Sequence, residues 1–365
     1  MQLFFSQLLS RFELPVAPVN VEPFGEGLIN STFKISDEKG EPRYILQRVN
    51  HEVFKEVDVL QDNIERVTEH IRQKLLLAGI EDINKSVLRL ISTLDGKSYH
   101  FDGESYWRIY HFIQGSKSLN ALTPHSAYLS GQMFGDFQYM LSDLPEGSLK
   151  ESIPGFHNMP LRLSQFSQAL QDDRVGRAKE VRSVIDELER RATTYCVQEE
   201  LYSKGELPKR INHCDTKLNN ILFDESDTPL CVVDLDTVMP GFVLSDFGDF
   251  VRISGNKAPE DEPDLSKITL NKEIVLAYAD GYLSKACRFL TEREVQLLSY
   301  GPALMTYMQT VRFFTDYLNG DVYYKIAHEN HNLQRTHAQF RLLQLLEEWQ
   351  KPLGEELSLL YAKYR

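Results

Sequence analysis

The strongest indication of how this chain folds is the segment INHCDTKLNNILFDESDTPLCVVDLDTVMPG, residues 211–241. It places His213, Asp215 and Asn220 in an H-x-D-x-x-x-x-N arrangement, and then gives two short apolar runs separated by an acidic turn. The second run ends on Asp234. Two such strands form a hairpin, so Asn220 and Asp234 are expected to emerge at the same end of it. An amide oxygen beside a carboxylate suits Mg²⁺, which prefers oxygen ligands and retains several waters.

The composition around this segment is that of a packed globular protein. Of the 365 residues, 42% are hydrophobic and 25% are charged, which excludes a disordered chain. The 40 Lys and Arg residues face 53 Asp and Glu residues, and a net charge of −13 gives no general attraction for nucleic acid or an anionic membrane. No apolar run is long enough to span a membrane. Four scattered cysteines predict free thiols in a reducing cytoplasm, and the oligomeric state stays open.

The character of the sequence changes near residue 114. Residues 1–113 are predicted to be mostly strands with one long helix, and residues 121–365 are predicted to be mainly helical. The polar connector QGSKSLN, residues 114–120, is the expected hinge between these two lobes. The fold class is therefore α+β, and a cleft between lobes is a preferred place for ligands. A first helix is expected to carry Phe4, Leu8, Leu9 and Phe12 on one apolar face. Strands are expected at 16–24, 31–35, 43–49 and 107–113, and a second helix at 57–77. A hairpin is expected to join 86–92 and 98–101 around Asp95–Gly96.

The order of these features resembles that of the protein-kinase-like phosphotransferases, which fold into a β-rich N-lobe and a larger helical C-lobe. The resemblance implies ATP as co-substrate, Asp215 as the base that accepts the acceptor's proton, and His213 as the residue that orients its loop. It also implies Asn220 and Asp234 as ligands of Mg²⁺. Asp236 points to the same side as Asp234 by strand alternation, and either touches a second metal or its water shell or is simply solvated.

Nucleotide contacts are expected near the N-terminus. Gly25 and Gly27 lie in FGEGLIN, where glycine lets backbone N–H groups approach phosphate oxygens, and Asn30 replaces the third glycine of the usual loop. The third strand of such enzymes carries a lysine for the phosphates, but here it reads YILQRV. Gln47 and Arg48 are on opposite faces of that strand, so only one of them can face the cleft.

Two further residues lie close to the H-x-D segment. Lys217 is a candidate to neutralise the transferred phosphate in the absence of the strand lysine. Asp246 begins the D-F-G tripeptide that carries a metal ligand in protein kinases. Here it stands where a helix is expected to start, so we expect a structural role for it.

The chain leaves little room for an activation loop, because a Pro-Gly turn at residues 240–241 follows Asp234 closely. This favours a small-molecule acceptor, as in the aminoglycoside phosphotransferase and choline kinase group. Within that group the chain is most similar to the N-acetylhexosamine 1-kinases, in segments that include FGEGLINSTFKI, YILQRVN, IPGFHNMPLR, VVDLDTVMPGFVLSDFGDFVR and VRFFTDYLNGDVYYK. The resemblance implies transfer of the γ-phosphoryl group of ATP to the anomeric 1-hydroxyl of N-acetylglucosamine or N-acetylgalactosamine.

A sugar site needs convergent hydrogen-bonding groups and an aromatic wall. Arg312, Asp316, Tyr317 and Tyr323 cluster on one expected helix and its exit, and His157 is a further candidate. Arg312 and Asp316 are at i and i+4, where a plain ion pair is the alternative. Two other functions stay open, namely a kinase of another small alcohol (an aminoglycoside, choline or another sugar) and a catalytically silent nucleotide-binding protein.

Overall fold

The computed structural model describes residues 2–25, 27, 29–119, 121–145 and 147–365, so Asn120 at the end of the expected hinge lies outside the described residues. The chain forms two compact units, and the α+β architecture expected from the sequence is confirmed. The helical unit comprises Ala121–Tyr139, Gly155–Leu218 and Pro240–Arg365. The sheet unit comprises Met1–Asn120 together with two later segments, Met140–Pro154 and Asn219–Met239. The grouping therefore differs from a linear division at residues 114–120, because Asn220 and Asp234 belong to the sheet unit.

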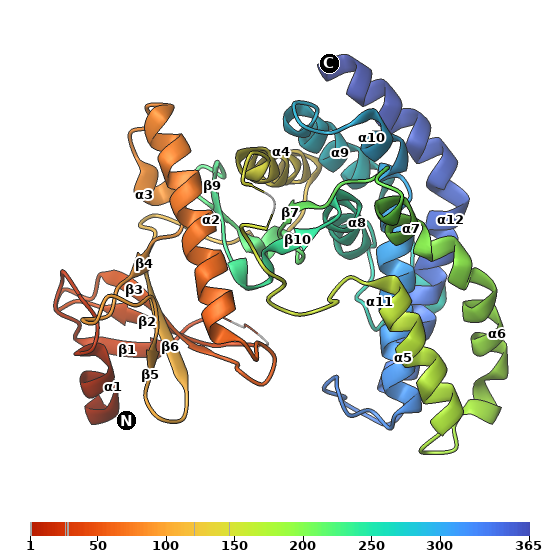
Figure 1. Cartoon of the computed structure of the whole chain (residues 1–365), viewed down its shortest axis with the longest axis horizontal. Helices are drawn as coiled ribbons and strands as arrows, with labels where there is room; N and C mark the ends of the chain where they lie inside the picture. The colour runs from red at the N-terminus through yellow and green to blue at the C-terminus, as the bar shows by residue number, and fades with distance from the viewer. Residues whose placement is uncertain (1, 26, 28, 120, 146) are drawn as a thin grey trace. The chain divides into compact units, whose positions relative to one another are not determined.

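The sheet unit is built on an antiparallel sheet with strand order β1-β2-β3-β6-β4 (Figure 1). The helix α2 (Val57–Leu77) buries Leu60, Ile64, Val67 and Ile71, whose spacing of three and four residues forms one apolar face. The remaining elements of the unit are α1 (Gln2–Leu9), β1 (Asn20–Pro23), β2 (Ser31–Ser36), β3 (Pro42–Val49), α3 (Ile83–Ser86), β4 (Leu90–Ile91), β5 (His100–Phe101), β6 (Tyr106–His111), β8 (Ile221–Phe223) and β9 (Pro229–Val232).

The predicted hairpin around Asp95–Gly96 is wrong. A turn does form there, since the Thr93 N–H donates to the Lys97 carbonyl at 2.7 Å. The flanking strands β4 and β5 do not pair with each other, however, and both pair with β6. The central strand β6 offers each of them a long partner, and the β5–β6 hairpin is closed instead at Asp102, whose carboxylate accepts from two backbone N–H groups of its own turn.

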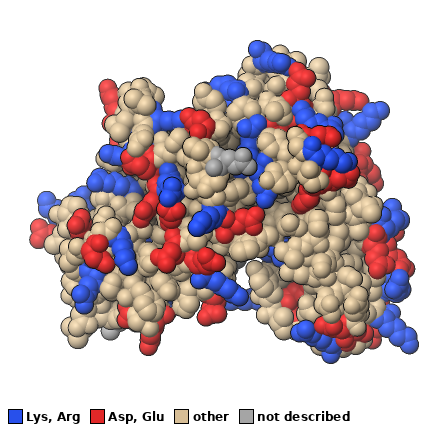
Figure 2. Space-filling model, in the orientation of Figure 1, with Lys and Arg blue, Asp and Glu red and all other residues tan. Residues whose placement is uncertain are grey.

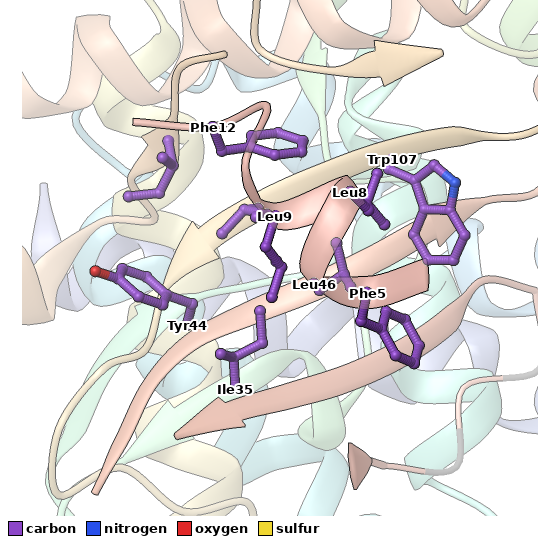
Figure 3. Close-up of a cluster of buried hydrophobic side chains, with 10 residues drawn as sticks. Phe5, Leu8, Leu9, Phe12, Ile35, Tyr44, Leu46 and Trp107 are labelled. Atoms are coloured by element: carbon purple, nitrogen blue, oxygen red, sulfur yellow. The ribbon is translucent and has the colours of Figure 1, made fainter. Parts of the chain in front are cut away.

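One face of the sheet packs against α1, as Figure 3 shows. Phe5, Leu8 and Leu9 of the helix contact a layer of strand residues that includes Leu46 and Trp107. Phe5 takes the place expected for Phe4, whose side chain is 43% exposed. Successive strand residues point to opposite faces, so Gln47 of β3 and Arg108 of β6 lie on the other face of the sheet.

The helical unit is organised around α11 (Gly301–Leu318), which packs against α5, α8 and α12 (Figure 1). A Cβ on Gly248 would lie 2.3 Å from the Gly301 carbonyl oxygen, so only glycine allows α8 to approach the start of α11 this closely. The other elements are α4 (Pro124–Leu141), α5 (Met159–Asp172), α6 (Arg182–Arg191), α7 (Val197–Ser203), β7 (Arg210–Asn212), β10 (Met239–Gly241), α8 (Val243–Ser254), α9 (Lys272–Ala286), α10 (Glu292–Leu298) and α12 (His331–Tyr364).

The surface carries both signs of charge. Figure 2 shows Lys and Arg side chains interspersed with Asp and Glu over the face turned to the viewer. Within the described ranges, no helix combines the length and the apolar character needed to cross a membrane.

Candidate functional site

The predicted hairpin of the H-x-D segment is present as β8 and β9 in the sheet unit. Ile221 pairs with Val232, the last residue of β9, and the following residue, Val233, donates its N–H to the Asn220 carbonyl at 2.9 Å. Asn220 therefore lies at the same end of the hairpin as Asp234, as expected. Asn220 is buried, whereas Asp234 is exposed and adopts a left-handed backbone conformation with φ 60°.

These two side chains fit Mg²⁺ that is held jointly with nucleotide phosphates. Magnesium is commonly bound by one or two carboxylates together with substrate phosphates and water, and does not require a cage made entirely of protein groups. The described residues contain no group of three or more His, Cys, Asp or Glu side chains placed to hold a metal. Asn220 and Asp234 are thus able to provide oxygen donors to such a shared site, and their role as metal ligands stays a prediction.

Asp236 differs from its prediction. Residues 235–237 form a short 3-10 helix, so the strand alternation that was to align Asp236 with Asp234 does not apply. The Asp236 side chain is buried, with one oxygen 2.5 Å from Arg108 Nη2 and the other 2.6 Å from Asn30 Nδ2. The solvated alternative for Asp236 is therefore wrong, since the side chain is buried and each oxygen accepts one hydrogen bond, and its role as a second metal ligand stays a prediction.

The glycine segment is connected to this carboxylate through Asn30. Its amide donates to Asp236, and its side-chain oxygen accepts from the Asn50 N–H at 2.9 Å, just beyond β3. Gly25 has φ +74°, a conformation that favours glycine, whereas a Cβ on Gly27 would meet only the Asn30 carbonyl at an ordinary 3.5 Å. Backbone conformation therefore requires glycine at position 25 and not at position 27.

The structure separates the two residues that stand where a lysine was expected on β3. Arg48 is exposed on the α1 face and donates to Ser31 Oγ at 3.1 Å. Gln47 lies on the opposite face, where its side-chain oxygen accepts from Nε and Nη2 of Arg108 at 3.0 and 2.8 Å. Arg108 is a residue that the sequence analysis missed. The sequence around Arg108 gives no local indication of this contact, because only the pairing of β3 with β6 places Arg108 opposite Gln47.

In the helical unit, the backbone around the predicted base is held by Asp246. Its carboxylate accepts from the N–H groups of His213 and Cys214 and from Gln138 Nε2, each at 2.8 Å. Cys214 has φ 62°, which is unfavourable for a residue with a Cβ, so these bonds fix a strained turn. Burial raises the pKa of Asp246 to about 6. The structural role predicted for Asp246 at the start of α8 is confirmed.

The three catalytic candidates lie together on this turn. The His213 ring is fully buried, with ring centroids 5.6 Å from Phe134 and 5.9 Å from Phe137, as suits a residue that orients the loop. Lys217 Nζ lies 2.7 Å from Asp215 Oδ2, and both side chains are about one-third exposed. The ammonium group of Lys217 thus lies beside the carboxylate that is expected to take the proton.

We expect Asp246→Ala to lower the free energy of unfolding by about 3 kcal/mol, because it leaves three buried donors without an acceptor. Asp62→Ala, which removes an exposed i, i+4 ion pair with Arg66, is the matched control and should cost about 0.5 kcal/mol or less. Urea denaturation of both variants measures the difference. Equal losses would refute the role given to Asp246.

A cluster of basic side chains lies near Asp215 in the same unit. Burial, followed by the charges of Arg312, Arg162 and Arg252, lowers the pKa of His157 to about 3, and Asp215 is the acid that opposes this shift. Burial and the charge of Arg312 likewise lower the pKa of Arg162 to about 10. His157 is therefore neutral at physiological pH, and the cluster is cationic.

Two arginines of this cluster, Arg162 and Arg312, donate hydrogen bonds to neutral groups. Arg162 donates to the Phe156 carbonyl at 2.8 Å, and Arg312 donates to Gln309 Oε1 at 3.1 Å. Arg312 also lies over the rings of Phe156 and Tyr324, at 5.5 and 5.8 Å from their centroids. Phe156 and Tyr324 are aromatic residues that the sequence analysis missed. Phe156 adjoins His157 in the sequence, and that was the available signal.

The structure shows what the other acceptor candidates contact. Asp316 does not pair with Arg312, because its buried carboxylate accepts from the N–H groups of residues 322–324 and from Asn332 Nδ2. It thus fixes the loop after α11. The Tyr317 ring is buried under the Arg177 guanidinium, 4.4 Å from its centroid. Tyr323 is 65% exposed and is among the groups that influence the pKa of Arg162.

Comparisons with known proteins show which family and which solved folds this chain is similar to. A family model described as "Phosphotransferase enzyme family" (APH) matches residues 20–288. Similar solved structures include an aminoglycoside phosphotransferase from Alicyclobacillus acidocaldarius (13% identity, TM-score 0.61, covering 95% of this chain and 96% of that one). They also include a spectinomycin phosphotransferase in complex with ADP and spectinomycin (14%, 0.54, 97% and 98%), and a choline/ethanolamine kinase family protein from Mesorhizobium loti (14%, 0.50, 94% and 92%).

Proposed function

We propose that this chain, which belongs to the phosphotransferase enzyme family, transfers the γ-phosphoryl group of ATP to the anomeric 1-hydroxyl of an N-acetylhexosamine. Family membership supplies the reaction class. The acceptor rests on the similarity to N-acetylhexosamine 1-kinases in the sequence and on the chemistry of the groups near Asp215. ATP is proposed as the donor because a similar structure is a complex with ADP.

In this proposal one group of residues acts on the acceptor and another binds Mg²⁺ and the nucleotide. Asp215 accepts the proton of the acceptor hydroxyl, with Lys217 beside it to balance charge. Asn220 and Asp234 hold Mg²⁺, which neutralises charge on the transferred phosphoryl group. The glycine segment, anchored by Asn30, approaches the phosphates through its backbone. With Asp215, Asn220 and Asp234 all present, the silent alternative has little support.

The observation that carries the acceptor assignment is the cationic cluster of His157, Arg162 and Arg312. A neutral imidazole and two guanidinium groups bonded to neutral partners offer donors to a ligand rich in oxygen. Aminoglycosides and choline are cations and would be repelled by the same groups. Phe156 and Tyr324 supply the aromatic wall that a sugar ring needs.

The experiment that tests the proposal is an ADP-release assay with N-acetylglucosamine, N-acetylgalactosamine, choline and kanamycin as acceptors. We expect release above the ATPase background only with the N-acetylhexosamines. Preference for choline or kanamycin would support a kinase of another small alcohol. Release with none of the four would support the silent protein.

Arg312→Lys is expected to raise the KM for N-acetylhexosamine at least tenfold, roughly 1.4 kcal/mol, and to leave the KM for ATP within about twofold. A guanidinium can bridge two sugar oxygens with fixed donors, and an ammonium group cannot reproduce this. Arg293→Lys, at an exposed arginine of the same unit, is the control and should change neither constant. Steady-state kinetics with each substrate varied in turn checks this, and an unchanged sugar KM would remove Arg312 from the acceptor site.

A further inference from the structure

We infer that Arg108 supplies the cation that binds the nucleotide phosphates, replacing the lysine that this chain lacks on β3. The inference rests on the proposed function, since it presupposes that a nucleotide binds to the sheet unit. It assigns the task to a different strand, β6, and to a guanidinium in place of an ammonium group.

The first observation is an unsatisfied buried donor. The Arg108 side chain is 1% exposed, and its Nε and Nη2 atoms are bonded to Gln47 and Asp236. Its Nη1 atom is buried and has no hydrogen-bond partner among the residues that the structure describes. A buried donor without a partner destabilises the protein, and more so when it belongs to a charged group, so Nη1 requires an acceptor that the described residues do not provide.

The second observation is that the guanidinium is fixed in place before any ligand arrives. Gln47 Oε1 accepts from Nε, the Asp236 carboxylate accepts from Nη2, and the Tyr110 ring centroid lies 5.2 Å from Arg108 Cζ. Asp236 also anchors Asn30, and through it the glycine segment. One carboxylate thus positions both the arginine and the loop whose backbone is proposed to approach the phosphates.

The third observation is electrostatic. The pKa of Arg108 is raised. Burial opposes this shift, whereas the charge of Asp236 and that of Asp234, two residues earlier in the chain, favour it. Arg108 therefore stays charged and lies within electrostatic reach of the proposed magnesium ligand. A charged N–H donor at Nη1 binds an anionic oxygen most strongly, and a phosphate group matches the donor geometry of arginine.

This arrangement also explains the glutamine on β3. Thr32, Gln47 and Arg108 are direct cross-strand neighbours on β2, β3 and β6. A lysine at position 47 would place a second cation against Arg108, where like charges destabilise a cross-strand pair. Gln47 instead provides a neutral acceptor and donates its own amide to Thr32 Oγ1 at 3.2 Å.

The test is isothermal titration calorimetry of adenosine, ADP and ATP with the full chain. Each titration is done with Mg²⁺ and with EDTA, so that the contribution of the metal to nucleotide affinity is measured separately from that of Arg108. We expect Arg108→Gln to weaken ADP and ATP binding at least tenfold under both conditions and to change adenosine binding less than twofold. The double variant Gln47→Lys/Arg108→Gln, which returns a cation to β3, should regain at least a third of the wild-type ADP affinity. Arg66→Gln, at an exposed ion pair on α2, should change nothing.

The outcomes separate the two proposals. If the wild-type chain binds neither ADP nor ATP, the proposed function fails. If the wild type binds them and Arg108→Gln leaves the ratio of ADP to adenosine affinity unchanged, the inference about Arg108 is overturned and the proposed function stands. Should Arg108→Gln not fold, the double variant Arg108→Gln/Asp236→Asn also neutralises the carboxylate that loses its partner, and an unchanged affinity ratio in that variant overturns the inference equally.

Discussion

Asp215→Asn is expected to lower kcat by roughly 10²–10⁴-fold, the usual contribution of a positioned general base. The amide cannot accept the hydroxyl proton of the acceptor, whereas its size and shape preserve the turn that Asp246 holds. Nucleotide binding, assigned to the other unit, should change little. Steady-state kinetics gives kcat, and calorimetric titration gives the nucleotide affinity.

The control for this variant is Asp186→Asn, which makes the same change at an exposed aspartate of the helical unit that pairs with Arg182. Its kcat should equal that of the wild type. Activity of Asp215→Asn within threefold of wild type would remove Asp215 from the role of base. A large loss of nucleotide affinity would mean that the residue acts through the fold of its loop.

Asp234→Asn is expected to lower turnover by roughly 10²–10³-fold and to abolish the strengthening of ATP binding by Mg²⁺. Asparagine is chosen because it tolerates the left-handed backbone at position 234, where alanine would add strain. The change thus removes charge from the proposed metal site and leaves the hairpin intact. Titration of ATP with Mg²⁺ and with EDTA measures the metal-dependent part directly.

The same hairpin offers a matched control. Asp227 also has a left-handed backbone, with φ 61°, but it lies in the turn at the opposite end and pairs with Lys117. Asp227→Asn should therefore retain both turnover and the Mg²⁺ effect. If both variants keep the Mg²⁺ effect on ATP binding, the metal does not bind at Asp234.

The features that the sequence predicted correctly are those encoded within one short segment. The β8–β9 hairpin follows from two apolar runs on either side of a turn in which Asp224 accepts from the N–H groups of Ser226 and Thr228. The start of α8 at Val243 explains why Asp246 holds the neighbouring backbone and does not end a strand. Both results depend on interactions that local spacing describes well.

The errors have a common physical cause. Asp236 was placed by strand alternation, but its segment forms a 3-10 helix, and its carboxylate binds Arg108 and Asn30, which are distant in the sequence. Asp316 was placed by helical spacing beside Arg312, but the loop after α11 folds back and donates three N–H groups to it. The contacts of a polar side chain depend on residues that are distant in the sequence, and the spacing of residues within one segment does not reveal these contacts.

The same limit applies to the acceptor groups. Spacing along α11 identified Arg312, but the rings that lie against it belong to Phe156 and Tyr324, which are far apart in the sequence. Only the packing of the helical unit brings them to one place. The cationic character of the cluster, which favours a neutral sugar over a cationic acceptor, became visible only with that packing.

The measurement that tests the central claim most directly is phosphorus NMR of the product formed from ATP, Mg²⁺ and an N-acetylhexosamine. The account predicts a sugar 1-phosphate whose phosphorus signal is coupled to the anomeric proton, and predicts that it is absent with Asp215→Asn. A 6-phosphate, or no phosphorylated sugar with either epimer, would contradict the acceptor assignment.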